Sequence, residues 1–286
     1  MWTAVVLAGG VLPAAAQQVA SPPPADTSKP PETLFTRHDA YLAGGFVLAT
    51  IALGPADRAI ARELQDSSRQ SSHFLKNTAR AFDVTAVPGS LVIGTGMYAV
   101  GRLTHQPRVA DLGLHGTEAI LLGTAITDVV KNFAGRRRPF VDVEHPYDFR
   151  FTRGFKSDDY KSFPSGHTTA GFAAAAAVTA ETSRWWPGSG KYVGPLMFGG
   201  ATLIGASRMY ENKHWASDVL VGAAIGTFSG LKVVRYSHAH PNNPIDRRLL
   251  SFTVAPAPSG GAVVAWTFPT GKAGAVPAAV AGDARN

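Results

Sequence analysis

Three short clusters along the chain hold the side chains best suited to chemistry. In chain order they are Lys131-x6-Arg138-Pro139, Pro164-Ser165-Gly166-His167 and Ser207-Arg208-x5-His214-x3-Asp218. Guanidinium groups bind two oxygens of one oxyanion through a planar fork, whereas an ammonium group supplies a point charge. The set suits a pocket that holds a tetrahedral oxyanion and attacks its central atom with an imidazole.

The second cluster predicts a tight turn followed by a helix. Backbone N–H groups at a helix start, together with the Ser165 hydroxyl, form a natural cradle for an anion. Gly166 lets the backbone approach that anion without a side chain in the way. His167 then lies at the rim of the cradle, where it could donate a proton to a departing alkoxide.

The third cluster pairs a nucleophile with a residue that orients it. His214 and Asp218 are four residues apart, so on a helix they share one face. An aspartate that accepts one imidazole N–H fixes the tautomer and leaves the other nitrogen free to attack phosphorus. Pro139 indicates that the preceding helix ends here, which places Arg138 at the mouth of a loop. Arg136 and Arg137 are expected to be solvated surface charges.

The other histidines have no comparable setting, and we expect surface or packing roles for them. They are His38, His73, His105, His115, His145, His238 and His240. The sequence contains no H-E-x-x-H motif, carboxylate cluster or cysteine–histidine spacing, so no metal site is predicted.

All the fixed positions of the three clusters match, in order, the signature of the phosphatidic acid phosphatase type 2 and vanadium haloperoxidase superfamily. The resemblance runs from Lys131 to Asp218 at the level of motifs, and the helical pattern of residues 84–235 fits the family core. It implies an all-α helical bundle of the acid phosphatase and haloperoxidase type. It also implies a metal-independent phosphomonoesterase, without cofactor, that forms a phosphohistidine intermediate.

The family's roles carry over residue by residue. The resemblance makes His214 the nucleophile, Asp218 its orienting partner and His167 the acid that protonates the leaving oxygen. The phosphate-binding residues it implies are Lys131, Arg138, Ser165, Gly166 and Arg208. The expected substrate is a phosphorylated small molecule, a lipid phosphate or a diphosphate.

Two other functions remain open at the level of sequence. A vanadate-dependent haloperoxidase would use the same residues, with vanadate in the phosphate position. A non-catalytic envelope protein would use the pocket only to bind anionic headgroups, although the intact histidines and aspartate argue against it.

The amino-acid composition limits the binding partners and kinds of site that we expect for this protein. Apolar residues make up 45% of the 286 residues, charged residues only 16%, and the net charge is +7. Because aromatic residues do not interleave with the basic ones, a nucleic-acid partner is not expected. The absence of cysteine excludes disulfides, cysteine–zinc sites and thiol nucleophiles.

Periodicity and turn residues predict a helical array with a small β-hairpin after it. The expected helices cover 40–53, 58–80, 84–103, 109–133, 167–182, 192–207 and 215–235, with strands at 252–255 and 262–268. The predicted parts are a signal peptide (1–16), a Pro-rich linker (17–38), the helical phosphatase domain (39–236) and a C-terminal extension (237–286) that holds the hairpin and a disordered tail. The five consecutive alanines between Thr169 and Ala180 predict close helix packing.

The location follows from the amino terminus and from hydropathy. A short apolar run before Ala14-Ala15-Ala16 is typical of a signal peptide. A membrane span needs about 20 apolar residues, and only 84–100 and 192–206 come near this. We therefore expect an exported bundle in the periplasm or cell envelope, associated with the membrane surface. An integral membrane protein with an outward-facing site is the alternative.

Overall fold

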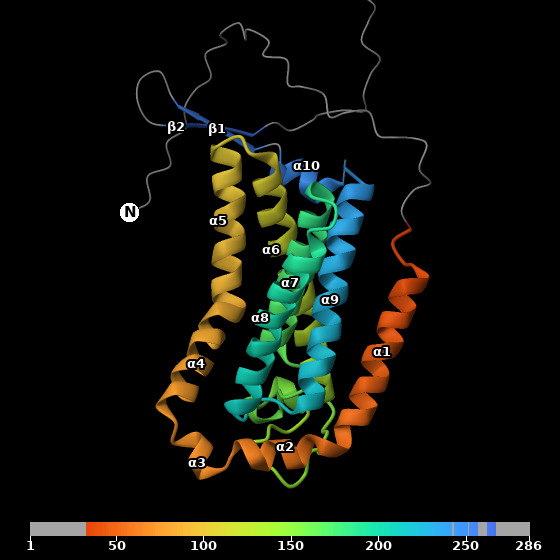
Figure 1. Ribbon diagram of the computed structural model, residues 1–286, viewed down its shortest axis with the longest axis vertical. Helices are drawn as coiled ribbons and strands as arrows, with labels where there is room; N and C mark the ends of the chain where they lie inside the picture. The colour runs from red at the N-terminus through yellow and green to blue at the C-terminus, as the bar shows by residue number, and fades with distance from the viewer. Residues whose placement is uncertain (1–32, 242, 251, 257–261, 267–286) are drawn as a thin grey trace, which may run out of the picture. The chain divides into compact units, whose positions relative to one another are not determined.

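The structure is a computed structural model that describes residues 33–241, 243–250, 252–256 and 262–266. Most of these residues are helical, which confirms the all-α class. The helices are α1 (Arg37–Leu53), α2 (Asp57–Leu64), α3 (Ser67–Gln70), α4 (His73–Val84), α5 (Ser90–Leu103), α6 (Pro107–Ala134), α7 (Gly166–Trp185), α8 (Gly190–Tyr210), α9 (Ala216–Ala239) and α10 (Pro244–Leu250). Figure 1 shows α5 to α9 standing as a bundle, with α1 beside it.

Of the parts predicted at the two ends of the chain, only some lie within the described residues. The predicted signal peptide and most of the predicted linker, up to residue 32, lie outside the described residues, as does the predicted tail from 267 onward. Two strands, β1 (Phe252–Pro256) and β2 (Ala262–Trp266), pair antiparallel with Phe252 opposite Trp266. The accessory role of this segment stays a prediction.

One predicted helix is wrong. Residues 58–80 form three short helices, because two polar side chains start new ones. The Asp66 carboxylate accepts the Ser68 N–H at the start of α3, and the Ser72 hydroxyl accepts the Leu75 N–H at the start of α4. Conversely, α4 continues into α5 through a π-helical turn, Thr85–Gly89, that contains Pro88.

The core of the bundle surrounds α7, which packs against α6, α8 and α9. Ala170, Ala173 and Ala177 of α7 are fully buried, so the alanine run is the packing surface that the sequence predicts. Glycines of α9 face it: a Cβ on Gly226 would lie 2.3 Å from the Thr169 carbonyl oxygen. The small residues bring the two backbones together.

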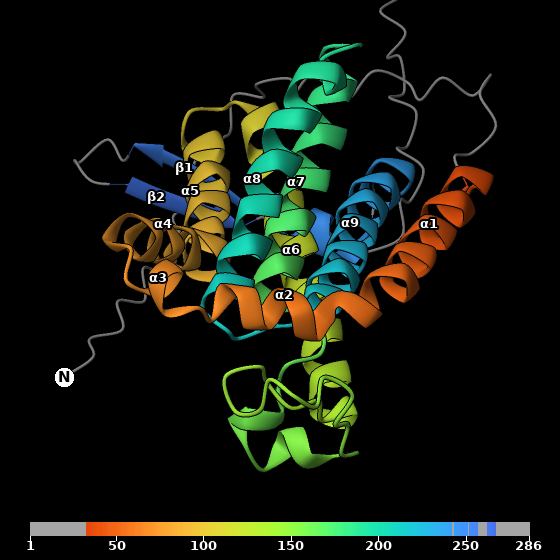
Figure 2. The same cartoon turned by 60° about the horizontal axis from the view of Figure 1, so that its bottom comes forward.

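One end of the bundle gathers the segments that carry the three sequence motifs. There α6 ends at Ala134, and the left-handed conformation of its C-cap Gly135 (φ 59°) lets the chain turn away. The connection 136–165 returns to the start of α7, and Figure 2 shows it projecting below the bundle, with α2 crossing the same end. The end of α8 and the start of α9 complete this face.

Three helical segments are long and apolar enough to cross a membrane. They are Arg37–Leu64, His73–Leu103 and Ala216–Ala239. The second contains the predicted stretch 84–100, whereas the stretch 192–206 is not among the candidates found in the described residues. Large apolar side chains also face outward along the bundle, including Leu48, Val92 and Leu196.

The close approach of α7 and α9 makes a direct prediction. Gly226→Ala should lower the free energy of unfolding by about 1–3 kcal/mol, because its Cβ would overlap the α7 backbone. The matched control is Gly199→Ala in α8, where nothing lies within 4 Å of the added Cβ. Since alanine favours a helix interior by about 0.5–1 kcal/mol, the control should be neutral or stabilising. Thermal unfolding in detergent measures both, and equal shifts would contradict the packing.

Candidate active site

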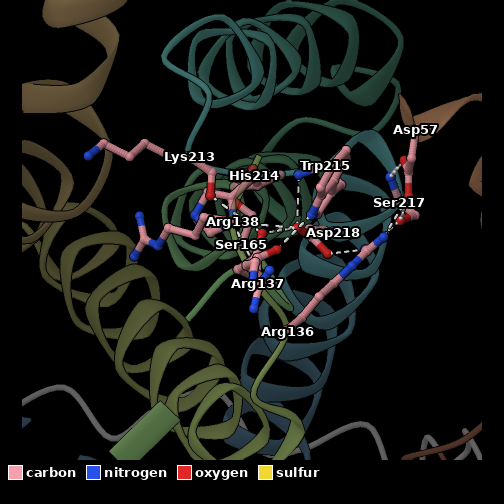
Figure 3. Close-up of polar contacts among 12 residues, drawn as sticks. Asp57, Arg136, Arg137, Arg138, Ser165, Lys213, His214, Trp215, Ser217 and Asp218 are labelled. Atoms are coloured by element: carbon pink, nitrogen blue, oxygen red, sulfur yellow. Dashed lines mark hydrogen bonds and ion pairs between the residues drawn. The ribbon is translucent and has the colours of Figure 1, made fainter. Parts of the chain in front are cut away.

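The structure gathers the eight predicted site residues at the end of the bundle where α6 and α8 end and α7 and α9 begin. Lys131 lies in the last turn of α6 and Arg208 in the last turn of α8. Ser165 is the N-cap of α7, with Gly166 and His167 as its first helical residues. Arg138 and His214 lie in connections, and Asp218 in the first turn of α9. Figure 3 shows several of these side chains together.

Three cations surround the His214 imidazole. A Cβ on Gly166 would lie 3.3 Å from Lys131 Nζ, so the ammonium group is next to the start of α7. Arg138 is buried, and its Nε donates to the Asp158 carbonyl oxygen at 2.9 Å. Arg208 is buried as well. Burial, followed by the charges of these three cations, holds the pKa of His214 well below its usual range.

The start of α7 has the features of an anion site. Ser165 is fully buried, and its Oγ accepts a hydrogen bond from Thr168 Oγ1 at 2.9 Å, which leaves its own hydroxyl proton to donate. Among the described residues no side chain caps this helix terminus. The first N–H groups of α7, at the positive end of the helix dipole, therefore remain available to an anion.

The predicted hydrogen bond between Asp218 and His214 is wrong. His214 Nδ1 instead lies 2.5 Å from the Ser162 carbonyl oxygen and 3.9 Å from Asp218 Oδ2. The reason is that α9 begins at Ala216, so His214 precedes the helix and does not share its face with Asp218. Asp218 Oδ2 accepts from the Ser162 hydroxyl at 2.5 Å and from the Trp215 N–H at 2.8 Å.

Arg136 is not the solvated surface charge that the sequence suggested. Its side chain is only 2% exposed, and its guanidinium lies 2.5 Å from Asp218 Oδ1 and 2.8 Å from Asp57 Oδ2. Ser217 Oγ accepts a further bond at 2.8 Å, and the Pro146 carbonyl oxygen accepts one from Nε. Figure 3 shows Arg136 reaching between α2 and α9.

Arg137 is not a free surface charge either, because two carboxylates pair with it. It is 20% exposed and pairs with Asp142 and Asp148, each at 2.9 Å. The expectation for both arginines therefore fails. Arg136 pairs with carboxylates far away along the chain, and Arg137 pairs with two carboxylates of its own connection, 136–165.

A carboxylate from α4 also reaches the site. Asp83 Oδ1 lies 3.1 Å from His167 Nε2, and the same oxygen pairs with Arg208 Nη1. Asp83 thus contacts two residues that the motifs assign to a phosphate and its leaving group. No sequence pattern pointed to Asp83, nor to Asp57 or Ser162, since each acts on partners distant along the chain.

The comparisons with known proteins agree with the motifs. Residues 114–241 match the family model described as the PAP2 superfamily. The segment 114–241 belongs to this superfamily. The suspected membership is therefore confirmed, and residues 131–218, which carry the motifs, fall inside the matched segment.

Two curated relatives and one solved structure illustrate the similarity. A lipid A 1-phosphatase of Porphyromonas gingivalis is 43% identical over 72 residues, which are 24% of this chain and 15% of that protein. A PA-phosphatase related-family protein of Dictyostelium discoideum is 29% identical over 154 residues, covering 50% and 54%. The chain thus spans about half or less of these relatives. The crystal structure of a transmembrane PAP2 type phosphatidylglycerolphosphate phosphatase from Bacillus subtilis is 20% identical, with a TM-score of 0.49, over 70% of this chain and 96% of that one.

The buried arginine gives the testable prediction of this site. Arg136→Gln should lower the free energy of unfolding by about 3–5 kcal/mol, because it leaves two buried carboxylates without their cation. Arg69→Gln is the control, since Arg69 pairs with Glu63 on the exposed surface and should change stability by less than about 1 kcal/mol. Denaturant unfolding in detergent measures the difference. Similar losses of unfolding free energy in the two variants would show that the buried pair contributes no more to stability than the exposed one.

Proposed function

We propose that this protein is a phosphatase that hydrolyses a lipid phosphomonoester through a phosphohistidine intermediate on His214. The observation that carries the proposal is a buried imidazole, held by a backbone carbonyl, among three cations. Membership of the PAP2 superfamily supports the reaction class. The similarity to a lipid A 1-phosphatase supports a lipid substrate.

The hydrogen bond to Ser162 prepares His214 for attack. A carbonyl oxygen only accepts, so Nδ1 carries the proton in this contact and Nε2 carries the lone pair. The lowered pKa keeps the imidazole neutral, as a nucleophile requires. Asp218 acts as a positioning residue here, because it holds the Ser162 hydroxyl and the Trp215 N–H that flank His214.

The reaction would proceed in two balanced steps. His214 Nε2 forms a bond to phosphorus while the bond from phosphorus to the leaving oxygen breaks, and that oxygen takes a proton from His167. Burial and the nearby cations lower the pKa of His167 to about 4 in the free protein, so His167 acquires this proton as the negatively charged phosphate binds. Water then attacks the phosphohistidine, His167 accepts a proton from the water, and the P–N bond breaks to release phosphate and restore His214.

The charge that develops on phosphorus would be met by groups that are already in place. Lys131, Arg138 and Arg208, with the first N–H groups of α7, stabilise the equatorial oxygens. Loss of one preorganised donor of this kind costs about 10²–10³ in kcat in other enzymes. Charge compensation at this site therefore comes from the chain's own cations.

Two cavities beside the site support an amphiphilic substrate. An apolar cavity of about 260 Å³ lies between α4–α5 and α6–α8, with Phe82, Ala86 and Ile204 in its lining. Phe82 neighbours Asp83, so an acyl chain in this cavity would lead to the phosphate site. A polar cleft of about 390 Å³, lined by Arg80, Arg208 and Lys213 among others, offers cations for further headgroup oxygens.

We further propose that the protein is embedded in a membrane through its three apolar helical segments. The outward-facing apolar side chains of α1, α5 and α8 support this over the surface-associated bundle expected from sequence. A site on the outer face of the cell envelope remains our proposal for its orientation.

The nucleophile can be tested directly. His214→Ala should lower phosphate release from phosphatidate in mixed micelles by at least about a thousandfold, since the residual rate comes from binding groups alone. With ³²P-labelled phosphatidate, wild type should yield an acid-labile phosphoprotein that the variant lacks. His240→Ala, at an exposed histidine on the far end of α9, should retain activity and labelling.

Full turnover by His214→Ala would overturn the assignment of the nucleophile. Peroxide-dependent halide oxidation with vanadate, without phosphate release, would instead favour a haloperoxidase. Binding of anionic headgroups without either activity would favour the non-catalytic envelope protein.

The pKa of His214 gives a separate prediction. Since its pKa is lowered, the imidazole should stay neutral, with its proton on Nδ1, as the pH falls through about 6.5. Histidine ¹⁵N NMR between pH 8 and 5 should show this tautomer persisting, with His214→Asn to assign the signal. Below about pH 6.5 the unfolded chain binds a proton at His214 that the folded chain does not bind. Falling pH therefore lowers the free energy of unfolding through this group. Titration of the assigned signal at the ordinary imidazole pKa would contradict the lowered value.

A further inference from the structure

A second group of titratable side chains lies at the opposite end of the bundle. Its members are His115 and Glu118 of α6, Glu181 of α7, His238 of α9 and Asp246 of α10. His115 precedes Lys131 by sixteen residues on α6, about 24 Å along a helix axis. The proposed phosphatase chemistry uses none of these side chains.

Glu181 fixes the orientation of His115. The carboxylate is fully buried, and its Oε1 lies 2.5 Å from His115 Nδ1. Both of its oxygens lie 3.0 Å from His238 Nε2. An ionised carboxylate only accepts hydrogen bonds, so Nδ1 of His115 carries a proton and its Nε2 faces the other side of the ring.

Three polar atoms on that other side lack hydrogen-bond partners among the described residues. They are His115 Nε2, Glu118 Oε1 and Asp246 Oδ1, and all three are shielded from solvent. His115 and Glu118 are three residues apart on α6, so they are neighbours on one face. A ligand atom from each of the three residues lies within 4.8 Å of the other two. Buried polar atoms without partners are rare in folded proteins.

We propose that His115, Glu118 and Asp246 bind a divalent transition-metal ion, with Zn²⁺ as the best match. An imidazole nitrogen and two carboxylates form a suitable ligand set, and Zn²⁺ binds such atoms at about 2.0–2.2 Å. Tetrahedral ligands at that distance lie about 3.4 Å apart, and His115 Nε2 lies 3.5 Å from Asp246 Oδ2.

The surroundings of the ligands fit a metal site. Glu181 accepts the Nδ1 proton of His115, which is the contact that orients most metal-binding histidines. Two ionised carboxylates balance the double charge of the ion. The bound ion would fasten α10 to α6, and its role is therefore structural.

A protonated His115 between Glu181 and Asp246 is the competing arrangement. It would place an N–H toward Asp246, yet the 3.5 Å separation is long for a charged hydrogen bond. It would also leave Glu118 Oε1 buried without a partner. A metal ion satisfies the nitrogen and both carboxylates together.

The test uses the full chain in detergent, first dialysed against EDTA and then titrated with Zn²⁺. Calorimetry and metal analysis should give about one tightly bound Zn²⁺ per chain, and Zn²⁺ should raise Tm by several degrees while Mg²⁺ does not. Co²⁺ at the same site should give visible d–d absorption. A wild type that shows neither Zn²⁺ binding nor a Tm shift overturns the proposal.

Variants identify the ligands. Asp246→Asn and Glu118→Gln keep the side-chain shape and should each weaken Zn²⁺ binding by at least about a hundredfold. Glu63→Gln, at an exposed carboxylate, and His240→Ala should leave it unchanged. His238→Ala should weaken it by about tenfold or less, because His238 contacts Glu181 and the His115 ring but is not one of the three proposed ligands. Equal affinity in Asp246→Asn and wild type, or complete loss in His238→Ala, overturns the ligand set.

Discussion

The buried ion pair between Arg136 and Asp218 is the contact on which the rest of the site depends. Both groups are almost completely removed from water, so either charge alone would be costly. The guanidinium offsets that cost by also binding Asp57 of α2, Ser217 of α9 and the Pro146 carbonyl oxygen. Because its donors are used in several directions, the arginine fixes α2, α9 and the connection after α6 relative to one another.

The position of His214, the proposed nucleophile, follows from that pair through a short chain of contacts. Arg136 holds Asp218, Asp218 accepts from the Ser162 hydroxyl, and the Ser162 carbonyl oxygen fixes the Nδ1 proton of His214. The orienting effect of Asp218 on the imidazole therefore passes through one intervening residue. Such an arrangement keeps the carboxylate 3.9 Å from the ring, so burial and, after it, the neighbouring cations set the lowered pKa of the imidazole.

The site residues that could be predicted from the sequence are those marked by motifs of neighbouring residues. Lys131, Ser165 and Arg208 occupy helix ends because glycine, proline and spacing mark those ends, and the motifs predicted them together. The alanine run of α7 likewise predicted its packing. The partners of Arg136 could not be predicted, since Asp57 lies 79 residues away along the chain and only tertiary packing joins them. The same holds for Asp83 beside His167, and for Glu181, which lies 66 residues from His115.

The two ends of the helical bundle have opposite electrostatic potentials. This difference accounts for the cationic cluster at one end and the acidic cluster at the other. The amino terminus of α7, at the positive end of its dipole, lies among Lys131, Arg138 and Arg208, where an anion is favoured. Its carboxyl-terminal turns carry Glu181, and the carbonyl end of a helix adds partial negative charge. Glu118 and Asp246 increase that negative potential, which only a cation or a proton can balance. The proposed phosphate at one end and the proposed metal ion at the other would balance both potentials with one set of helices.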